Sequence, residues 1–348
     1  MRMKLGIVGF GFMGHCDADL MKTFDEIDLV AVADTNPEQL KDAPEGVETY
    51  GSIDEMLEKA DINVVMISVP NPFHLEMVEK AANAGKHIIC EKPAAMSVAQ
   101  FDRMVEVTKQ NKVLLTVHQQ RRWDTDYRIM KEVYDKKMVG DIYVIKSQLY
   151  GFNGNMHDWH IYPEMGGGML YDWGVHLIDQ ILDMVNSEIT SIYADLRNVI
   201  NEKVDDYFNI LIKFKNGIVA EIELGTYYLT PKRSWFIGGN KGSAMIDGFN
   251  GEGKIVRTAH LLGNVPGKIT MSAAGPTRSF GPAAPGLLLE EPLPEADVKQ
   301  RDYFVHFLKA FNGEEEIIVR PDQVRRVLCV MDAVRESART GEAITNVR

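Results

Sequence analysis

Hydrophobic residues follow two different patterns along the chain, one before and one after residue 122. In the first part, short apolar runs alternate with longer amphipathic segments such as 72–84 and 98–110. Apolar runs of this kind are typical of strands buried on both faces of a sheet, and the segments between them are long enough for crossover helices. We therefore expect a doubly wound parallel sheet of the Rossmann type over residues 1–122. The predicted strands cover residues 4–8, 29–33, 63–69, 87–90 and 113–117.

After residue 122 the runs are longer and alternate apolar with polar positions. Asn216-Gly217 stands between two of these runs and is the commonest two-residue hairpin turn, so the neighbouring strands are expected to be antiparallel. We expect a second, α+β domain over residues 123–348, built on a large, mostly antiparallel open sheet. Its predicted strands cover 142–150, 189–197, 207–214, 218–224 and 234–238, and helices at 301–311 and 321–340 close the chain.

Residues 261–298 interrupt the second domain. This segment contains six prolines and is expected to be a long irregular excursion. Such a stretch is usually a lid, an arm at an oligomer interface, or poorly ordered. The sequence leaves these three interpretations open.

Composition limits the classes of partner. A length of 348 residues suits two domains, and a formal net charge of −12 argues against a nucleic-acid groove, which needs clustered Lys and Arg. The apolar run near the N-terminus is broken by glycines, unlike a signal peptide, and no stretch reaches the roughly 20 apolar residues that span a bilayer. The three cysteines are widely spaced and fit reduced thiols. We expect a cytoplasmic protein with no nucleic-acid or membrane partner.

A glycine-rich motif follows the first predicted strand and opens a helical segment. The first glycine of such a motif permits a tight turn, the second admits a pyrophosphate, and the third lets helix and strand pack closely. The free N–H groups at the helix N-terminus attract the phosphates. We expect a dinucleotide site here, with a merely tight turn as the alternative. The residues are Gly9, Phe10, Gly11, Phe12, Met13 and Gly14.

Asp34 ends the second predicted strand, 20 residues beyond Gly14. An acidic residue at this place can accept hydrogen bonds from the adenosine ribose. No Arg or Lys follows before Lys41, so a 2′-phosphate against Asp34 would meet a like charge without a compensating cation. NAD is therefore expected rather than NADP. The alternative is that Asp34 caps the segment that begins near Pro37.

Three further motifs complete a recognisable set. Residues 68–74 read S-V-P-N-P-F-H, residues 91–93 read E-K-P, and residues 166–176 read G-G-G-M-L-Y-D-W-G-V-H. Together with the glycine motif, in this order, they resemble the glucose–fructose oxidoreductase/inositol dehydrogenase/rhizopine-catabolism (Gfo/Idh/MocA) family. The resemblance extends from residue 4 to about 341. One departure is that His15 follows Gly14 directly, whereas many members carry histidine a few residues later; we expect no chemistry from this position.

The resemblance implies an NAD-dependent dehydrogenase that oxidises a secondary or anomeric carbinol of a sugar, glycoside or inositol. It also implies a homodimer or homotetramer and a cis bond between Lys92 and Pro93. Lys92 and His176 would form the acid–base pair, with Asp172 orienting. The expected cofactor-binding residues are Gly9, Phe10, Gly11, Phe12, Met13, Gly14, Asp34, Val69, Pro70, Asn71, His74, Glu91 and Lys92.

The three expected catalytic residues also make chemical sense by themselves. In open α/β sheets ligands bind beyond the carboxyl ends of the strands, where Lys92 lies, and its ammonium can polarise a substrate C–O bond. Asp172 and His176 are four residues apart, so on a helix they share one face, and a carboxylate can fix the tautomer of an imidazole. Whether Lys92 or His176 is the base stays open. Taken alone, Lys92 has the alternative of an ordinary surface lysine, and His176 has the alternative of a histidine whose hydrogen bonds are satisfied within the protein.

Substrate contacts are expected from both domains. Trp159 can stack on a sugar face, whereas the arginines at 121–122 either pair with acidic groups inside the protein, which we favour, or bind an acidic substrate. His157, His160 and His176 together would suit zinc, but hydride transfer beside a lysine and a histidine needs no metal, and none is expected. The expected substrate-binding residues are Lys92, Gln120, Arg122, Trp159, Tyr171, Asp172 and His176.

Other activities fit the same scaffold. A glycosidase that oxidises C3 transiently and eliminates the aglycone would leave NAD unchanged over a cycle. A non-catalytic regulator that senses NAD and a sugar could lose Lys92 or His176, and this chain keeps both. Reduction of an imine or enone is a third alternative, in relatives that often lack the Asp–His pair.

Overall fold

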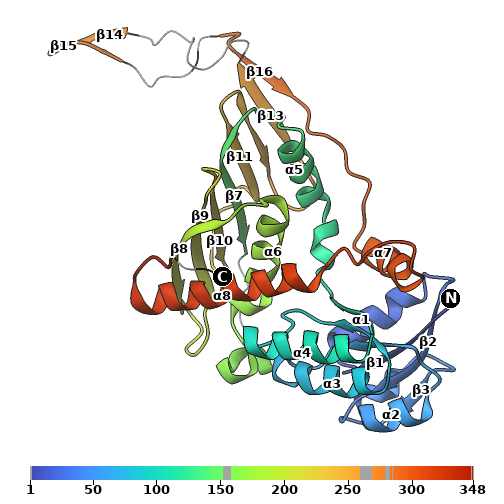
Figure 1. Ribbon diagram of the computed structural model, residues 1–348. Coiled ribbons are helices and arrows are strands. Elements are labelled where there is room, and N and C mark those ends of the chain that lie inside the picture. The colour runs from blue at the N-terminus through green and yellow to red at the C-terminus, as the bar shows by residue number, and fades with distance from the viewer. Residues whose placement is uncertain are drawn as a thin grey trace.

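The computed structural model describes residues 2–151, 158–258, 269–278, 283, 285–345 and 347. The N-terminal part is a six-stranded sheet with the order β3-β2-β1-β4-β5-β6, in which every neighbouring pair is parallel (Figure 1). This order confirms the predicted Rossmann arrangement, and it reverses between β1 and β4, where ligands of such sheets bind. The strands are β1 (Met3–Val8), β2 (Ile27–Ala33), β3 (Glu48–Tyr50), β4 (Val64–Ile67), β5 (His87–Cys90) and β6 (Leu115–Val117).

The helices of this part form where the sequence supplies an amphipathic face and a cap. In α4 (Val98–Gln110), the Ser97 hydroxyl accepts a hydrogen bond from the backbone N–H of Gln100, and the apolar side chains of one face are buried. The remaining helices are α1 (Phe12–Met21), α2 (Ile53–Lys59) and α3 (His74–Asn83).

The second sheet has eight strands in the order β16-β13-β12-β11-β7-β10-β9-β8. Only β7 and β10 run parallel; the other neighbours are antiparallel, which confirms the predicted mostly antiparallel sheet. The expected two-residue turn at Asn216-Gly217 is instead a three-residue loop, 215–217, because the backbone N–H of Phe214 donates to the carbonyl oxygen of Ile218 and only Gly217 of the loop has a positive φ, +88°. The strands are β7 (Ile142–Tyr150), β8 (Ile189–Arg197), β9 (Tyr207–Phe214), β10 (Val219–Gly225), β11 (Trp235–Gly239), β12 (Gly242–Ile246), β13 (Gly253–Thr258) and β16 (Leu288–Glu291).

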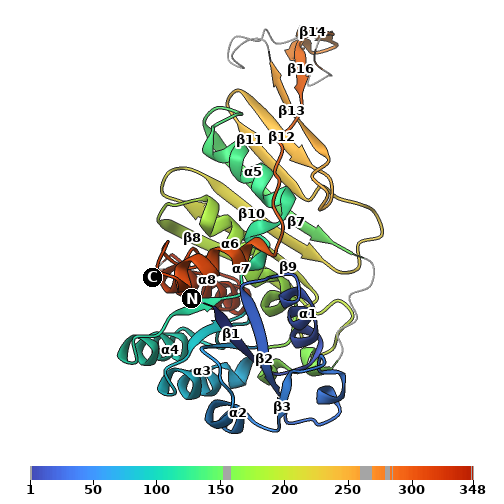
Figure 2. The same ribbon diagram turned by 90° about the vertical axis from the view of Figure 1, so that its right-hand side faces the viewer.

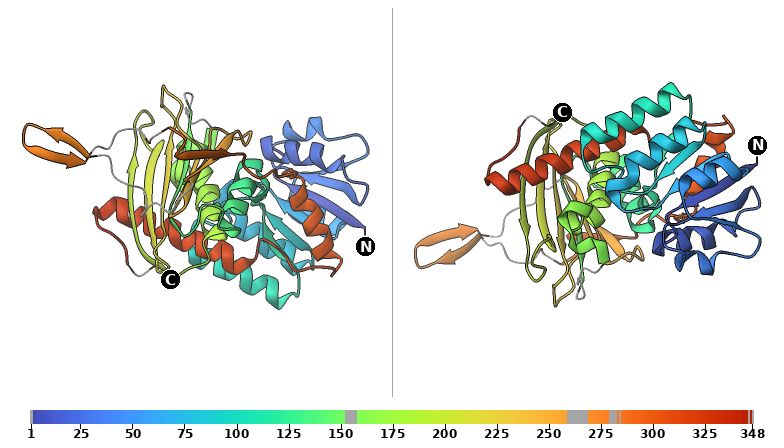
Figure 3. Two further views of the ribbon diagram at one scale, coloured as in Figure 1. Left: turned by 90° about the horizontal axis from the view of Figure 1, so that it is seen from above. Right: turned by 90° about the horizontal axis from the view of Figure 1, so that it is seen from below.

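Helices α5 (Thr125–Asp135), α6 (Val175–Met184) and α8 (Pro321–Thr340) lie against one face of this sheet (Figures 1 and 3). Helix α8 contacts β8 and α6 in the second domain and also α4 and β6 in the first, so it joins the two. Helix α7 (Asp302–Phe311) packs near α1 and the N-terminal sheet (Figure 2). None of the helices in the described part of the chain is both long enough and apolar enough to cross a membrane.

The structure overturns part of the prediction for residues 261–298. Strands β14 (Ile269–Ser272) and β15 (Gly275–Arg278) form a hairpin that projects away from the body (Figure 3), and β16 extends the large sheet by pairing with β13. The alternation of apolar and polar residues did not reveal these strands, because few of their side chains are buried; Met271, for example, is 78% exposed. Within this segment, residues 261–268, 279–282 and 284 lie outside the described part.

A buried ion pair joins the two parts of the chain. Arg122 follows β6, and its guanidinium donates two hydrogen bonds of 2.7 Å to the carboxylate of Asp179 on α6. A third donor reaches the side-chain oxygen of Gln323 on α8 at 3.1 Å. Arg122 and Asp179 are almost fully buried, so removing one partner would leave the other charge without compensation.

We expect Arg122→Ala to lower the free energy of unfolding by about 3–5 kcal/mol, because the Asp179 carboxylate would remain buried and unpaired. Urea denaturation followed by circular dichroism measures this loss. The matched control is Arg325→Ala, which removes an Arg–Asp pair of similar geometry between α8 and α4 whose side chains are 44% and 48% exposed. That variant should lose at most about 1 kcal/mol, and equal losses in both variants would contradict the argument from burial.

Candidate active site

The three glycines of the nucleotide loop have three different surroundings. Gly9 has a φ of +86°, and a Cβ placed there would lie 2.5 Å from the carbonyl oxygen of Ser68. A Cβ on Gly14 would lie 2.4 Å from the carbonyl oxygen of Gly9, whereas one on Gly11 would meet nothing within 4 Å. Gly9 and Gly14 are therefore required by packing within the protein, and Gly11 keeps a space open. This is the division of roles that a bound pyrophosphate requires.

The start of α1 is available to an anion. Gly11 is its N-cap residue, makes no side-chain cap, and the first turn carries no acidic residue. Between the glycines, Phe10 is buried, Phe12 is 82% exposed and Met13 is half-buried, so only Phe12 presents a large side chain beside the loop. The backbone N–H groups of this turn fit the phosphates of a dinucleotide.

Asp34 lies at the carboxyl end of β2 and braces the glycine loop. Its carboxylate accepts hydrogen bonds of 2.7 Å from the backbone N–H groups of Phe10 and Asn36. Each carboxylate oxygen accepts more than one hydrogen bond, so Asp34 can still bind ribose hydroxyls. Lys41, the next cation along the chain, pairs with Glu38 at 2.7 Å.

The imidazole of His74 supports the loop that follows β5. Its Nε2 lies 2.8 Å from the carbonyl oxygen of Val69, and its Nδ1 lies 3.1 Å from that of Pro93. The ring is completely buried, and burial lowers its pKa. The expected cis bond between Lys92 and Pro93 is present. His74, assigned from the sequence to the cofactor, therefore contacts protein carbonyls and supports the Lys92 loop.

Asn71 and the glycine run of the second domain meet across the domain boundary. Asn71 follows Pro70 in a short helix, Asn71–Phe73, and its side-chain N–H donates to the carbonyl oxygen of Gly166 at 3.2 Å. A Cβ on Gly166 would lie 2.5 Å from that same amide nitrogen. Gly166 is thus explained by close approach to the first domain, because only a residue without a side chain fits there. A Cβ on Gly167 or Gly168 would instead meet the His160 carbonyl oxygen or Oδ1 of Asp205, both in the second domain.

Lys92 reaches into the second domain. Its Nζ donates to the Oδ1 of Asp172 and to the backbone carbonyl oxygen of the same residue, both at 2.9 Å. The side chains are 16% and 28% exposed, so the pair is partly open to a ligand. Burial acts to raise the pKa of Asp172, but the Lys92 ammonium outweighs it and lowers that pKa below its ordinary value, so the carboxylate is ionised.

His176 has a different partner from the one expected. Its Nδ1 lies 2.9 Å from the side-chain oxygen of Gln119, and in the described part of the chain no hydrogen bond joins it to Asp172. Residues Leu170–Gly174 form a wide π-helical turn before α6, so the four-residue spacing does not put the two side chains on one α-helical face. Burial lowers the pKa of His176 well below its ordinary value.

The other residues expected to bind substrate have different surroundings. Trp159 stacks on His160, with ring centroids 3.7 Å apart, and His160 lies near enough to lower the pKa of Asp172. The Gln120 side-chain oxygen is buried without a partner among the described residues. Tyr171, in contrast, turns its hydroxyl to Arg335 of α8.

Two residues expected to contact a ligand have partners inside the protein. Arg122 is buried against Asp179, as the favoured interpretation held, because the carboxylate of α6 offers it two-point pairing inside the protein. Glu91, assigned to the cofactor, turns inward, and its Oε1 lies 2.5 Å from Nδ1 of His118.

Sequence reasoning gave no role to Gln119, which follows β6 and binds His176; its place after a parallel strand was the only available signal. Arg121, for which pairing with an acidic group was favoured, binds Asp124 at 3.0 Å, and its guanidinium lies 4.0 Å from the ring centroid of Trp173. Of the histidines considered for zinc, His157 lies outside the described residues. Within them, the group whose ligand atoms gather closely enough for a metal is instead Asp17, Glu91 and His118.

Comparisons with known proteins agree with this geometry. Residues 3–119 match the family model described as an oxidoreductase family with an NAD-binding Rossmann fold, and residues 127–245 match the GFO/IDH/MocA C-terminal domain. The solved structure of an NAD-binding protein from Listeria innocua superposes with a TM-score of 0.93 at 32% identity, covering 99% of each chain.

Two curated relatives are similar over much of their length. An oxidoreductase of Schizosaccharomyces pombe is 27% identical over 322 residues, which are 85% of this chain and 84% of that protein. The myo-inositol 2-dehydrogenase of Thermotoga maritima is 28% identical over 229 residues, 64% of this chain and 68% of that protein.

The open space at Gly11 leads to a prediction about the dinucleotide. Gly11→Ala should fold with nearly unchanged stability but bind NAD at least about tenfold more weakly, which corresponds to 1.4 kcal/mol, because the new methyl group occupies the space of the pyrophosphate. Calorimetric titration and thermal denaturation measure the two effects. Gly14→Ala is the comparison: it should lose stability, because its methyl group meets the Gly9 carbonyl oxygen. Unchanged NAD affinity in Gly11→Ala would show that the pyrophosphate lies elsewhere.

Proposed function

Because the chain belongs to the Gfo/Idh/MocA family of NAD-binding oxidoreductases, we propose that it oxidises a secondary or anomeric carbinol of a sugar, glycoside or inositol with NAD. The observation that carries this proposal is the contact of Lys92 with Asp172, 2.9 Å long, close to a buried, neutral His176. An ammonium, a carboxylate and a neutral imidazole are the groups that a carbinol needs in order to bind and lose its proton.

His176 is the base in this scheme. The side-chain oxygen of Gln119 can only accept a hydrogen bond, so the proton of the neutral ring lies on Nδ1 and the lone pair lies on Nε2. Burial, reinforced by the positive charges of Lys92 and Arg121, lowers the pKa of His176 and keeps the ring unprotonated at neutral pH. Nε2 is then free to accept the hydroxyl proton of a substrate. Gln119, rather than Asp172, fixes the tautomer.

Lys92 stabilises the negative charge that develops on the substrate oxygen. Asp172 is ionised and holds the ammonium in place through two oxygen contacts, one from its side chain and one from its backbone. An ammonium held in this way before the reaction needs little reorganisation as the alkoxide forms. Asp172 can accept a second substrate hydroxyl, which favours a polyol over a simple alcohol.

NAD supplies the hydride acceptor at its nicotinamide. The residues that would hold it are the glycine loop, the start of α1 and Asp34. The carboxylate of Asp34 favours a ribose with a free 2′-hydroxyl, because a 2′-phosphate would bring a second negative charge beside it. Trp173, which lies over Arg121 and near Phe249, gives an aromatic surface against which a sugar ring can pack.

The first test is turnover. Purified protein with NAD should reduce the cofactor in the presence of at least one member of a panel of inositols, aldoses and glycosides, and Lys92→Ala should lower that rate by roughly 10²–10⁴-fold while NAD still binds. The control is Lys86→Ala; Lys86 precedes β5 and binds the carbonyl oxygen of Ile62 at the opposite end of the strands. Undiminished turnover in Lys92→Ala would remove Lys92 from the mechanism. Release of an aglycone without net NAD reduction would indicate the glycosidase.

Cofactor preference is a separate test. Asp34→Asn keeps an oxygen that can accept from Phe10 but removes the charge, so the ratio of kcat/KM with NAD to kcat/KM with NADP should fall by about tenfold, or 1.4 kcal/mol. The matched control is Asp42→Asn, an exposed carboxylate further along the chain. A wild-type enzyme that prefers NADP would overturn the role given to Asp34.

A further inference from the structure

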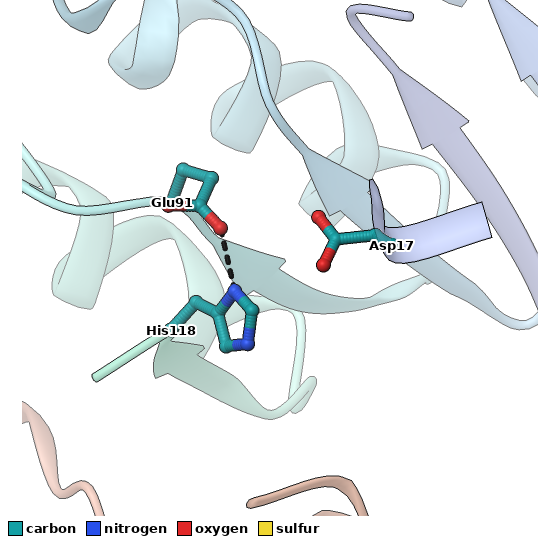
Figure 4. A group of neighbouring side chains, drawn as sticks. All are labelled: Asp17, Glu91 and His118. Carbon is teal, nitrogen blue, oxygen red and sulfur yellow. Dashed lines mark hydrogen bonds and ion pairs between the residues drawn. The ribbon is translucent and has the colours of Figure 1, made fainter. Parts of the chain in front are cut away.

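Three titratable side chains meet in the interior of the first domain, behind the Lys92 loop. Asp17 comes from α1, Glu91 follows β5 and His118 follows β6; they are 2%, 5% and 2% exposed. One nitrogen or oxygen atom of each lies within 4.8 Å of the others. Figure 4 shows the Asp17 carboxylate directed toward the hydrogen-bonded pair of Glu91 and His118. We call these three residues the buried triad.

Two atoms of the buried triad lack partners in the described structure. They are Oδ2 of Asp17 and Nε2 of His118, both shielded from solvent. A buried polar atom without a hydrogen bond is costly, so its presence calls for a specific cause. The His118 ring is enclosed by Tyr303 and Phe304 of α7, with centroids 4.7 and 5.1 Å away, so an entering metal ion would find few further ligands on that side.

Charge accounting indicates where the protons of the buried triad lie. With both carboxylates ionised and the imidazole neutral, two negative charges would share one buried volume, which is strongly unfavourable. A proton on His118 makes an ion pair with Glu91, and a second proton on Asp17 makes the triad neutral. The electrostatics agree: Glu91 raises the pKa of His118, His118 lowers that of Glu91, and burial raises that of Asp17 to about 7.

Two members of the buried triad are adjacent in sequence to residues of the proposed active site: Glu91 precedes Lys92 after β5, and His118 precedes Gln119 after β6. The backbone N–H of Lys92 donates to Oε2 of Glu91 at 3.2 Å. Gln119 directly follows His118, and its side chain binds His176. Asp17 lies on the helix whose N-terminus begins at Gly11. A movement within the triad is therefore transmitted to Lys92, to Gln119 and to the nucleotide loop.

We propose that Asp17 is a positioning residue: as a neutral acid it fills the space beside the Glu91–His118 pair without adding a second negative charge, and it thereby holds Lys92 and Gln119 in their working geometry. Its catalytic consequence rests on the proposed function, but the triad itself does not. The titratable groups that face Asp17 are Glu91 and His118, with Tyr303 of α7 and Cys90 of β5 beside them and Cys16 on its own helix. Among these, the acid whose protonation changes near neutrality is Asp17.

The first experiment measures stability against pH for the wild type and Asp17→Asn. Because the pKa of Asp17 is about 7 in the folded chain against 3.8 ordinarily, its stabilising contribution is complete below pH 3.8 and is lost as the pH rises to about 7. Asn stays neutral, so the free-energy difference should move in favour of the variant across this window and then level off. Asp19→Asn, an exposed carboxylate of the same helix, should show no such trend. Parallel curves for the wild type and Asp17→Asn would overturn the neutral state of Asp17, whether or not a substrate is known.

The second experiment measures positioning. In Asp17→Leu, acylation of Lys92 by an amine reagent, followed by peptide mass spectrometry, should become several-fold faster than in the wild type, with Lys86 as the internal reference. Asp17→Asn should largely restore the wild-type rate. With an active substrate, Asp17→Leu should lower kcat by about tenfold through misplacement of Lys92 while the KM for NAD changes little. An unchanged acylation rate in Asp17→Leu would overturn the positioning role. If Asp17→Leu does not fold, the kcat–pH profile of Asp17→Asn decides the question, and a profile identical to that of the wild type would overturn the positioning role.

Discussion

The contact between Lys92 and Asp172 is the interaction around which the rest of the structure is arranged. Lys92 belongs to the edge of the parallel sheet, and Asp172 belongs to the turn that opens α6 in the second domain. Neither domain alone contains the pair. Gly166 lets the two surfaces approach, the Asn71 side chain binds its carbonyl oxygen, and His74 fixes the loop that carries Lys92. Together these features support the contact of the Lys92 ammonium with the Asp172 carboxylate.

The segment from 118 to 122 distributes consecutive side chains to different parts of the molecule. His118 turns into the first domain, Gln119 binds His176, and Arg121 lies over Trp173. Arg122 then enters the second domain and pairs with Asp179. A short helix, Gln120–Trp123, follows β6 and makes this possible, because its tight turn points successive side chains in widely different directions. One short stretch therefore couples the buried triad, His176 and the domain boundary.

The fold could be predicted from the sequence because periodicity reports burial. Strands β7, β8 and β9 and helices α4 and α8 coincide with their predicted ranges. Strand β3 was missed because its three residues carry no apolar run, and β14–β16 were missed because exposed strands have no buried face to mark them. Strands β12 and β13 were also missed, because each has only one or two buried positions. The sequence identified Lys92, Asp172 and His176 as chemistry-bearing residues but not which of them touch. Contacts such as Gln119 with His176 join residues 57 positions apart, and no local pattern encodes them.

Burying charged side chains at the domain boundary costs desolvation free energy, but it restricts how the two domains can lie against each other. Transfer of an ion pair such as Arg122–Asp179 from water to the interior is opposed by desolvation, and an apolar pair of similar size often gives equal or greater stability. Such a pair nevertheless admits few alternative geometries, because any displacement leaves a buried charge without its partner. The same reasoning applies to Asp172, whose pKa is lowered chiefly by Lys92 against the opposing effect of burial. The charged contacts are thus better understood as determining the relative position of the two domains, and with it the distance between the ammonium of Lys92 and the imidazole of His176, than as the source of stability.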